Sequence, residues 1–250
     1  MKITFKAPKL LVDTLQDVYP VPATKCVPKW FKDLRHTPQM KTVKGCMTFF
    51  DSLTAGYIIK LTYDLEIQHG VLREDGKKTS WTRQGNPNRP NPSITIKHRA
   101  EVPPLDMNAH NPSQLKGSPM LKKNGHETAA VLKFMSPWRI ITPPGYSTLF
   151  ISPMNNPDDR FEIVPAIVDT DEWEDEINFP FIINGDKYKI LQDIVKVGTP
   201  IVQCIPFKRD NWESEMKVLD PYENEKTIFK MILHSYRYYR DKFWKRKKCT

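Results

Sequence analysis

Carboxylates are the residues of this sequence whose type and spacing most directly suggest chemistry. Six acids fall within eight residues: Asp169, Asp171, Glu172, Glu174, Asp175 and Glu176. Carboxylate oxygens are ligands that Mg²⁺ and Ca²⁺ prefer, but the cluster lacks the glycine and the alternating spacing of an EF-hand loop. A solvated loop, or a surface that pairs with a basic neighbour, is the alternative. We therefore expect no cofactor, and Mg²⁺ is the ion to test.

Two of these acids are candidate catalytic residues. Asp169 follows the apolar residues Ile167 and Val168, which makes it the best candidate for a buried functional carboxylate, with Asp171 as the second. The alternative is that Asp169 caps a turn, as aspartate often does. The sequence leaves both interpretations open.

Other familiar catalytic patterns are missing from the sequence. The six histidines are scattered and form no HxH, HxD or HExxH pair, and no P-loop, GxGxxG or GxSxG motif is present. Cys26, Cys46, Cys204 and Cys249 show no CxxC spacing, so structural zinc is not expected. We expect reduced thiols in a cytoplasmic protein.

A basic, aromatic tail could bind nucleic acid. Residues 237–248 hold seven Lys/Arg and one Asp, a net charge of +6 out of +9 for the whole chain, so attraction to an anionic partner should sit mostly there. Lys and Arg would meet phosphates while Tyr238, Tyr239 and Trp244 stack on bases. The candidate nucleic-acid residues are Arg237, Arg240, Lys245, Arg246, Lys247 and Lys248. An ordinary amphipathic helix with a solvated basic end is the alternative, and we expect no membrane partner.

Composition favours a folded protein with many loops. The 250 residues are 39% hydrophobic, and 22 prolines stand against 10 glycines, which favours loops and strand edges over long helices. The first residues lack the apolar core and cleavage site of a signal peptide. No stretch approaches the roughly 20 apolar residues that a membrane-spanning helix needs.

Alternating and apolar runs predict a mainly β protein with minor α content. Residues 3–5 and 56–68 should be strands, and Asp75-Gly76 should turn the chain into a returning strand at 79–82. Further strands are expected at 131–135, 139–142, 147–151, 161–168, 177–183, 187–195 and 200–207. Asn184-Gly185 should form a hairpin between two of them. A helical turn is expected at 28–35, with Trp30 and Phe31 in the core.

The C-terminus changes to helical spacing. Ile228, Phe229, Ile232, Leu233, Tyr236, Tyr239 and Phe243 recur at i, i+3 and i+4, which predicts one amphipathic helix over roughly 222–247. We expect this helix to dock on the rest of the chain or on a partner. The predicted organisation is one β-rich domain at 1–221, with a long Pro/Asn-rich loop at 83–125 that could also be an arm reaching another subunit, and a basic helix and tail at 222–250.

One region resembles the dUTPase and dCTP-deaminase barrel family. Pro144-Gly145-Tyr146, then Ile167-Val168-Asp169-Thr170-Asp171, then Gly198-Thr199-Pro200-Ile201-Val202-Gln203 occur in the order of that family's motifs. The resemblance covers 143–207, about a quarter of the chain. It implies a dUTPase-like or jelly-roll-like distorted barrel and a homo-oligomer, commonly a trimer.

The same resemblance implies a nucleotide pocket that lacks some of the residues that the family uses for hydrolysis. The pocket would involve Tyr146, Asn155, Asn156, Asp169, Asp171 and Gln203, with phosphates met by Arg139, Arg160 or Lys208-Arg209. The family's Arg-Ser segment would fall at 152–156, which has no arginine, and no Gly-rich arm follows. The resemblance therefore implies a barrel that has lost nucleotide hydrolysis.

Over most of its length the chain also resembles an uncharacterised family common in tailed-phage genomes. The residues that carry this resemblance are PKWFKDL (28–34), GYIIKLTYDLEI (56–67), PWRIITPPGYSTLF (137–150), IVDTD (167–171), INFPF (177–181) and GTPIVQCIPFKRDNW (198–212). It implies a phage protein in the host cytoplasm or in the virion.

Three functions follow from the sequence. The first is a non-enzymatic structural, assembly or binding protein built on a dUTPase-like barrel. The second is a nucleotide-binding or nucleotide-hydrolysing enzyme with a pocket around Asp169. The third is a nucleic-acid-binding module that uses the basic C-terminal helix.

Overall fold

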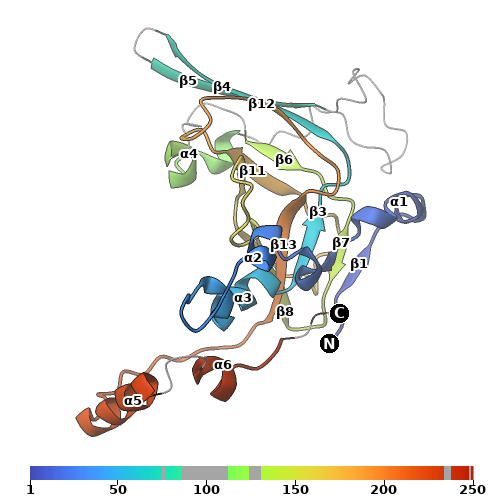
Figure 1. Ribbon diagram of the computed structural model, residues 1–250. Helices are drawn as coiled ribbons and strands as arrows, with labels where there is room; N and C mark the ends of the chain where they lie inside the picture. The colour runs from blue at the N-terminus through green and yellow to red at the C-terminus, as the bar shows by residue number, and fades with distance from the viewer. Residues whose placement is uncertain (75–76, 86–111, 124–130, 234–237, 248, 250) are drawn as a thin grey trace.

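The computed structural model describes residues 1–74, 77–85, 112–123, 131–233, 238–247 and 249. Within these ranges the chain is mostly β, with short helices at its N-terminal side and two more near its C-terminus (Figure 1). The predicted Asp75-Gly76 turn and most of the predicted loop at 83–125 lie outside the described residues. None of the described helices is long and apolar enough to cross a membrane.

The largest sheet has five antiparallel strands in the order β10-β8-β13-β3-β2. Their bounds are β10 Ala166–Val168, β8 Tyr146–Ile151, β13 Pro200–Lys208, β3 Tyr57–Lys60 and β2 Val21–Pro22. β13 lies at the centre because Ile201, Val202, Gln203 and Cys204 are consecutively buried, as in a strand covered on both faces. It pairs with β8 on one side and β3 on the other.

Three smaller sheets complete the β structure. Their strand orders are β6-β11-β9 (Leu132–Phe134, Phe179–Ile183, Phe161–Ile163), β12-β4-β5 (Ile190–Val195, Leu65–Glu74, Lys77–Gly85) and β1-β7 (Thr4–Lys6, Arg139–Ile141). All of these pairs are antiparallel. The four sheets stay open, so the described residues contain no closed barrel.

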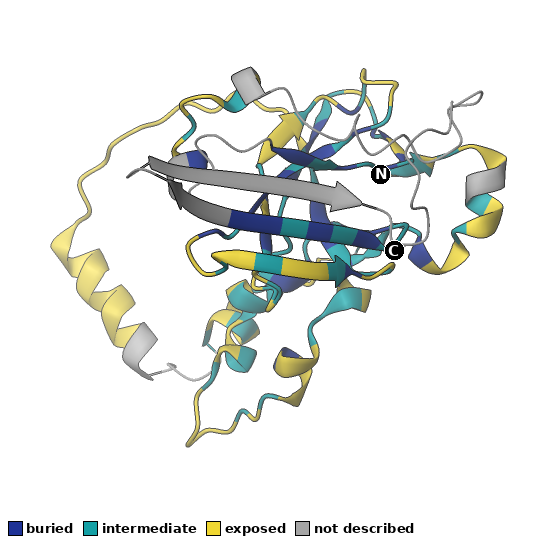
Figure 2. Ribbon diagram, turned by 90° about the horizontal axis from the view of Figure 1, so that it is seen from above, coloured by how far each residue is buried: buried dark blue, intermediate teal, exposed yellow. Residues whose placement is uncertain are grey.

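A shared aromatic core joins the sheets. Phe134 of β6 stacks on Phe181 of β11 with ring centroids 3.9 Å apart, and Phe161 of β9 meets Phe134 edge to face. Phe150 of β8 contacts Phe179 of β11, which links the five-stranded sheet to this cluster. Buried segments concentrate where the sheets meet (Figure 2).

The helices are short and lie mostly beside the sheets. They are α1 Lys9–Thr14, α2 Lys29–Asp33, α3 Met47–Thr54, α4 Pro119–Lys123, α5 Pro221–Leu233 and α6 Tyr238–Lys242, with 3-10 turns η1 Gln16–Val18, η2 Ala23–Cys26, η3 Val43–Gly45 and η5 Pro112–Leu115. The predicted turn at 28–35 is α2. Phe31 is buried as expected, but Trp30 is 37% exposed and packs edge to face on Phe31 and Phe49, so it is not a core residue.

Two predicted strands are each divided between two sheets. Residues 56–68 contain β3 and the start of β4, because buried Leu61 turns the chain through backbone bonds with Thr199 and Gly198. Residues 161–168 contain β9 and β10, separated by Pro165, which has no backbone N–H for a ladder. Alternation continued through the first break and gave no sign of it, whereas the second break lies at a proline that the apolar run concealed.

The hairpin predicted at Asn184-Gly185 is wrong. The turn exists, with Tyr188 N donating to Asn184 O at 2.8 Å, but β11 and β12 do not pair. β11 lies between β6 and β9, whereas β12 pairs with β4. A turn signal specifies a local reversal of the chain and leaves open which sheet the next strand joins.

The C-terminal helix predicted over 222–247 does not reach its predicted end. Helix is present at α5 Pro221–Leu233 and α6 Tyr238–Lys242, residues 234–237 lie outside the described residues, and 243–247 are not helical. α5 does not dock on the sheets, since every described side chain from Phe207 to Lys230 is exposed. Figures 1 and 2 show this segment standing away from the body before the chain returns towards α3.

Candidate functional site

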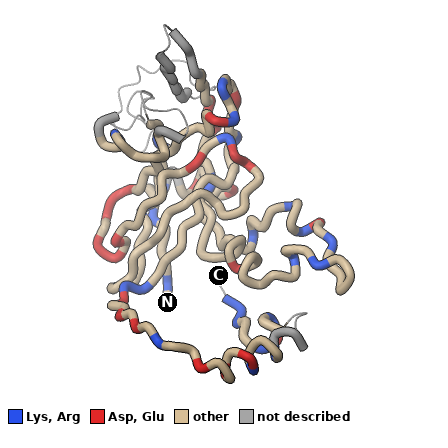
Figure 3. Tube along the Cα trace, turned by 90° about the vertical axis from the view of Figure 1, so that its left-hand side faces the viewer, with Lys and Arg blue, Asp and Glu red and all other residues tan. Residues whose placement is uncertain are grey.

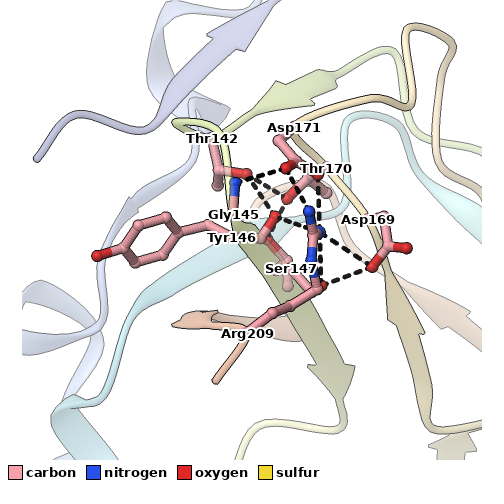
Figure 4. A network of polar contacts seen from close by, with 9 residues as sticks. Thr142, Gly145, Tyr146, Ser147, Asp169, Thr170, Asp171 and Arg209 are labelled. Carbon is pink, nitrogen blue, oxygen red and sulfur yellow. Dashed lines mark hydrogen bonds and ion pairs between the residues drawn. The ribbon is translucent and has the colours of Figure 1, made fainter. Parts of the chain in front are cut away.

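The candidate acids Asp169 and Asp171 lie in the turn that follows β10, on either side of buried Thr170. The Thr170 hydroxyl is 2.7 Å from that of Thr142 and 2.8 Å from that of Thr148, and Thr142 N donates to Thr170 O (Figure 4). This buried hydroxyl cluster fixes the turn against β8. The side chains of Asp169 and Asp171, on either side of Thr170, both approach Arg209.

Asp171 is held by Arg209, which follows β13. Arg209 Nη1 and Nη2 donate to the two carboxylate oxygens at 2.8 and 2.5 Å, and Gly145 N donates at 2.7 Å. The Asp171 side chain is only 4% exposed. The hydrogen bonds from Arg209, followed by that from Gly145, lower the pKa of Asp171 to about 2. This carboxylate is ionised and internally satisfied, so it is poorly suited to act as a general base.

Asp169 is exposed, which corrects the expectation of a buried functional carboxylate. Its side chain is 63% exposed, accepts from Ser147 Oγ at 2.6 Å and lies 3.2 Å from Arg209 Nη1. The backbone N–H groups of Glu172 and Trp173 both donate to Asp169 O, so residues 169–173 form a compact turn. Asp169 thus lies in a turn, but its backbone carbonyl closes that turn while its side chain bonds Ser147 and Arg209.

Two of the remaining acids of the cluster are exposed, and a third lies near an arginine. Asp175 lies 3.7 Å from Arg139, while Glu172 and Glu174 are exposed. Among the residues that the structure describes, no three His, Cys, Asp or Glu side chains converge in a group that could hold a metal ion.

Gln203 is buried and its side chain joins β13 to two other segments through hydrogen bonds. Its Oε1 accepts from Met154 N at 2.9 Å, and its Nε2 donates to Ser52 O at 2.9 Å and Ala55 O at 2.8 Å. The side chain is 1% exposed. All the donors of its amide are used within the chain, so Gln203 holds the loop after β8 and the end of α3 rather than facing a ligand.

Asn155 and Asn156 line a cavity of about 240 Å³ beyond β8. Asn155 has a left-handed φ of 57° and donates to Ser52 Oγ at 3.0 Å. Three carboxylates also line the cavity: Asp158, Asp159 and Glu162. None of the described lining residues is Lys or Arg, so the cavity disfavours phosphate groups.

Arg160, expected to meet phosphates, is committed to carboxylates. Its Nε and Nη2 donate to Asp158 at 2.8 and 2.7 Å, and its Nη1 donates to Asp193 at 2.8 Å. These contacts raise the pKa of the guanidinium above its ordinary value, with Asp158 as the largest cause. Arg160 therefore crosslinks the cavity wall to β12.

The structure separates the predicted nucleotide pocket into two groups. Asp169, Asp171 and Arg209 lie at the start of β8, with Tyr146, whose ring points away from them (Figure 4). Asn155, Asn156 and Arg160 lie beyond its end. The six residues of β8 keep the groups roughly 17 Å apart at about 3.3 Å per residue. The sequence order was read correctly, but the residues do not share one pocket.

The C-terminal tail returns to α3. Trp244 Nε1 donates to the Asp51 oxygens at 3.1 and 3.0 Å, and Lys247 Nζ also bonds Asp51. Lys245 and Arg246 are exposed, and Arg240 pairs with Asp241. Arg237 and Lys248 lie outside the described residues. Asp51 was not singled out from the sequence, since an acid separated by 193 residues from its partner leaves no local signal.

Sequence reasoning also missed a second basic segment. Residues 25–44 contain Lys25, Lys29, Lys32, Arg35, Lys41 and Lys44 with a single acid, Asp33. A charge count over this window would have found it. The modest net charge outside the tail concealed the segment, because acids elsewhere in the chain balance it.

Comparison with known proteins finds partial structural likeness to phage dUTPases. A mutant dUTPase from phage phi11 of S. aureus matches at 15% identity and a TM-score of 0.26, covering 37% of this chain and 75% of that chain. A mutant dUTPase of Staphylococcus bacteriophage 80alpha, solved with dUpNHpp, matches at 17% identity and a TM-score of 0.25, covering 38% and 67%. A second phi11 dUTPase structure gives 18% identity and a TM-score of 0.25 over 38% and 73%. No protein-family model and no curated protein matches the chain.

Proposed function

We propose that this protein is a non-enzymatic, self-associating binding protein of phage type that acts in assembly. The observation that carries the proposal is the projecting segment 210–233, called here the arm. Its described side chains are all exposed. The large apolar ones are Trp212 (89% exposed), Met216 (99%), Val218 (99%), Leu219 (60%), Tyr222 (74%), Ile228 (48%) and Phe229 (63%).

The helix within the arm has good local signals but no packing surface on its own chain. Asp220 accepts from Tyr222 N at 2.8 Å as an N-terminal cap, and Pro221 occupies the first helical position. An isolated helix of 13 residues is nevertheless marginal in water, where most helical stability comes from packing of an apolar face. We therefore infer that the exposed helix is stabilised by packing its apolar side chains against a partner.

A second copy of the chain is the partner that the helix itself fits. Its acids, Glu223 and Glu225, lie in the N-terminal half, and its lysines, Lys226 and Lys230, lie further along. Antiparallel pairing of two such helices places acids opposite lysines while Ile228 and Phe229 are covered, in a self-complementary twofold interface. The trimer implied by the sequence resemblance would need a different arrangement of the arms.

We further propose that the β-rich domain at 1–221 is a dUTPase-like scaffold and that the protein works in the cytoplasm of an infected host or in the virion. The ordered motifs at 143–207 and the resemblance of most of the chain to a tailed-phage family support this. A nucleotide enzyme has less support, because Arg160 and Arg209 are each bonded to carboxylates of the same chain.

The proposal is tested by size-exclusion chromatography with light scattering over a range of concentrations. The wild-type chain should have a mass above the 29.2 kDa of one copy. The measured mass divided by 29.2 kDa distinguishes a dimer from a trimer. Ile228→Asp with Phe229→Asp should return the mass to that of one copy. Asn224→Asp with Thr227→Asp adds the same charge without removing apolar surface and should retain association.

Two results would contradict the proposal. A wild-type chain that remains at 29.2 kDa at every concentration would exclude self-association through the arm. A thermal shift with dUTP and Mg²⁺ that disappears in Asp169→Ala would instead favour the nucleotide enzyme.

A further inference from the structure

Two basic segments that are far apart in sequence meet on α3. α2 packs on α3 through Phe31, whose ring stacks on Phe49 at 5.9 Å and Phe50 at 6.1 Å. On the same helix, Asp51 holds the tail through Trp244 and Lys247. Residues 25–44 and 240–247 therefore flank one short helix, and we call them together the basic face.

Most of the chain's excess positive charge lies on this face. Residues 25–44, Asp51 and residues 240–247 contain eleven Lys/Arg and three Asp, a net charge of +8 out of +9 for the whole protein. Figure 3 shows Lys and Arg recurring along the loop that carries α2 and η3. A concentration of charge of one sign on a small area favours a polyanionic partner.

Much of this charge is not neutralised within the chain. Asp33 pairs with Lys29, Asp51 with Lys247 and Asp241 with Arg240. In the part of the chain that the structure describes, no ion pair involves the other exposed cations of the face: Lys25, Lys32, Arg35, Lys41, Lys242, Lys245 and Arg246. This is the opposite of Arg160 and Arg209, which are committed to carboxylates.

Exposed aromatic rings accompany these cations. Trp30 is 37% exposed in the first turn of α2, and Tyr239 and Phe243 are 46% and 59% exposed in the tail. The Tyr239 and Phe243 rings stack on each other with centroids 6.5 Å apart. Aromatic faces beside a basic surface bind unpaired bases, which every nucleotide of a single strand presents.

We propose that the basic face binds single-stranded nucleic acid. Phosphates lie against the unpaired Lys and Arg of both segments, and bases stack on the exposed aromatic rings. The binding surface thus extends beyond the tail to residues 25–44, and Asp51 joins its two halves. The arm is not part of this face, so the proposal does not depend on self-association.

The test is fluorescence anisotropy of a labelled oligo-dT of about 20 nucleotides, titrated with the full chain at several salt concentrations. Lys32→Glu with Lys41→Glu changes the N-terminal half of the face, and Lys245→Glu with Arg246→Glu changes the tail half. Lys2→Glu with Lys116→Glu makes the same charge change on exposed residues outside the face.

We expect each of the first two pairs to weaken binding roughly tenfold at 50 mM salt. The slope of log K against log salt should become shallower by about 0.7 for each phosphate that no longer meets a cation of the protein. The control pair should change affinity by less than about twofold. An equal decrease in affinity for all three pairs, or no binding by the wild-type chain, would overturn the proposal. So would a decrease confined to the tail pair.

The aromatic rings supply a second readout. Phe243→Ala should weaken binding of the single strand more than binding of a duplex of equal length, because a duplex does not expose its base faces to stacking. Tighter binding to the duplex than to the single strand would refute the assignment. Binding to vesicles of anionic phospholipid without binding to oligo-dT would refute it as well.

Discussion

The ion pair between Arg209 and Asp171 changes the role that is inferred for Asp171. In sequence, Asp171 belongs to an acidic run with the appearance of a ligand site. In the structure its carboxylate accepts from both terminal guanidinium nitrogens of Arg209 and from Gly145 N. These bonds connect the end of β13 to the turn before β8 and to the turn after β10. The residue therefore holds the strands at the point where the arm begins.

This pair predicts how stability depends on pH. The pKa of Asp171 falls from its ordinary 3.8 to about 2 in the folded state, mainly because of Arg209. The contribution of the ionised carboxylate is therefore complete above about pH 4 and is lost as the pH falls towards 2. Asp171→Asn should lower the melting temperature at pH 6 and flatten its fall between pH 4 and 2. Asp210→Asn should retain the wild-type slope, and an unchanged slope in Asp171→Asn would contradict the role given to this pair.

The four cysteines are free and should differ in reactivity. The Thr48 hydroxyl, with the Phe49 backbone, lowers the pKa of exposed Cys46, whereas burial raises the pKa of Cys204. Thiolate is the reactive form. When the thiols react with a colorimetric disulfide reagent, we expect the fastest kinetic phase to come from Cys46 and to be absent in Cys46→Ser. A phase that appears only in denaturant should be lost in Cys204→Ser, and labelling of Cys204 in the native protein would disprove its burial.

Among the elements, β13 joins the other parts through Gln203. This polar side chain lies within the consecutively buried part of the strand. It bonds the loop at Met154 and the end of α3 at Ser52 and Ala55. Close to the same position, Gly56 has a φ of 67°, and a Cβ there would lie 2.1 Å from Cys204 O. The end of α3 thus approaches β13 too closely for any side chain at 56.

Replacing Gln203 by leucine should be destabilising. The change leaves Met154 N and two carbonyls without their partner. Each such group costs about 1–3 kcal/mol when fully buried, but these three belong to half-buried residues that water can reach, so we expect a total loss of about 2–4 kcal/mol. Urea unfolding measures this. Gln192→Leu makes the same chemical change on exposed β12 and should stay within about 0.5 kcal/mol of wild type. Equal midpoints for the two variants would exclude this role for Gln203.

Across the molecule as a whole, the chain leaves the body after β13 and returns to it at Asp51. Removing this carboxylate should release the tail without unfolding the sheets. In Asp51→Ala, amide hydrogen exchange over 238–247 should become faster, with β8 and β13 unchanged, because local opening costs less than global unfolding. Asp33→Ala removes an exposed acid on the adjacent α2 and should leave the tail protected. Unchanged exchange in Asp51→Ala would show that other interactions hold the tail.

Local patterns in the sequence predicted much of the secondary structure. Residues 3–5, 79–82, 131–135, 139–142, 147–151 and 200–207 all coincide with strands, and the turn at 28–35 is α2. Alternation and turn residues act over a few positions, so they place strands well. They failed at Leu61 and at Asn184-Gly185, where the next strand joins a different sheet for reasons that are not local. At Pro165 the sequence did carry a local signal, a residue without a backbone N–H, and the prediction passed over it.

For the candidate site, the amino-acid sequence was enough to establish which residue types are present and in what order. Which of them meet became clear only from the folded chain: Arg209 with Asp171, Arg160 with Asp158 and Asp193, and Asp51 with Trp244. The exposure of the arm and the meeting of two basic segments on α3 likewise come from the fold. Neutralisation and burial depend on partners brought close by packing. Apart from Asp158, which is two residues from Arg160, these partners lie 33 to 193 residues away in sequence, beyond the reach of any local pattern.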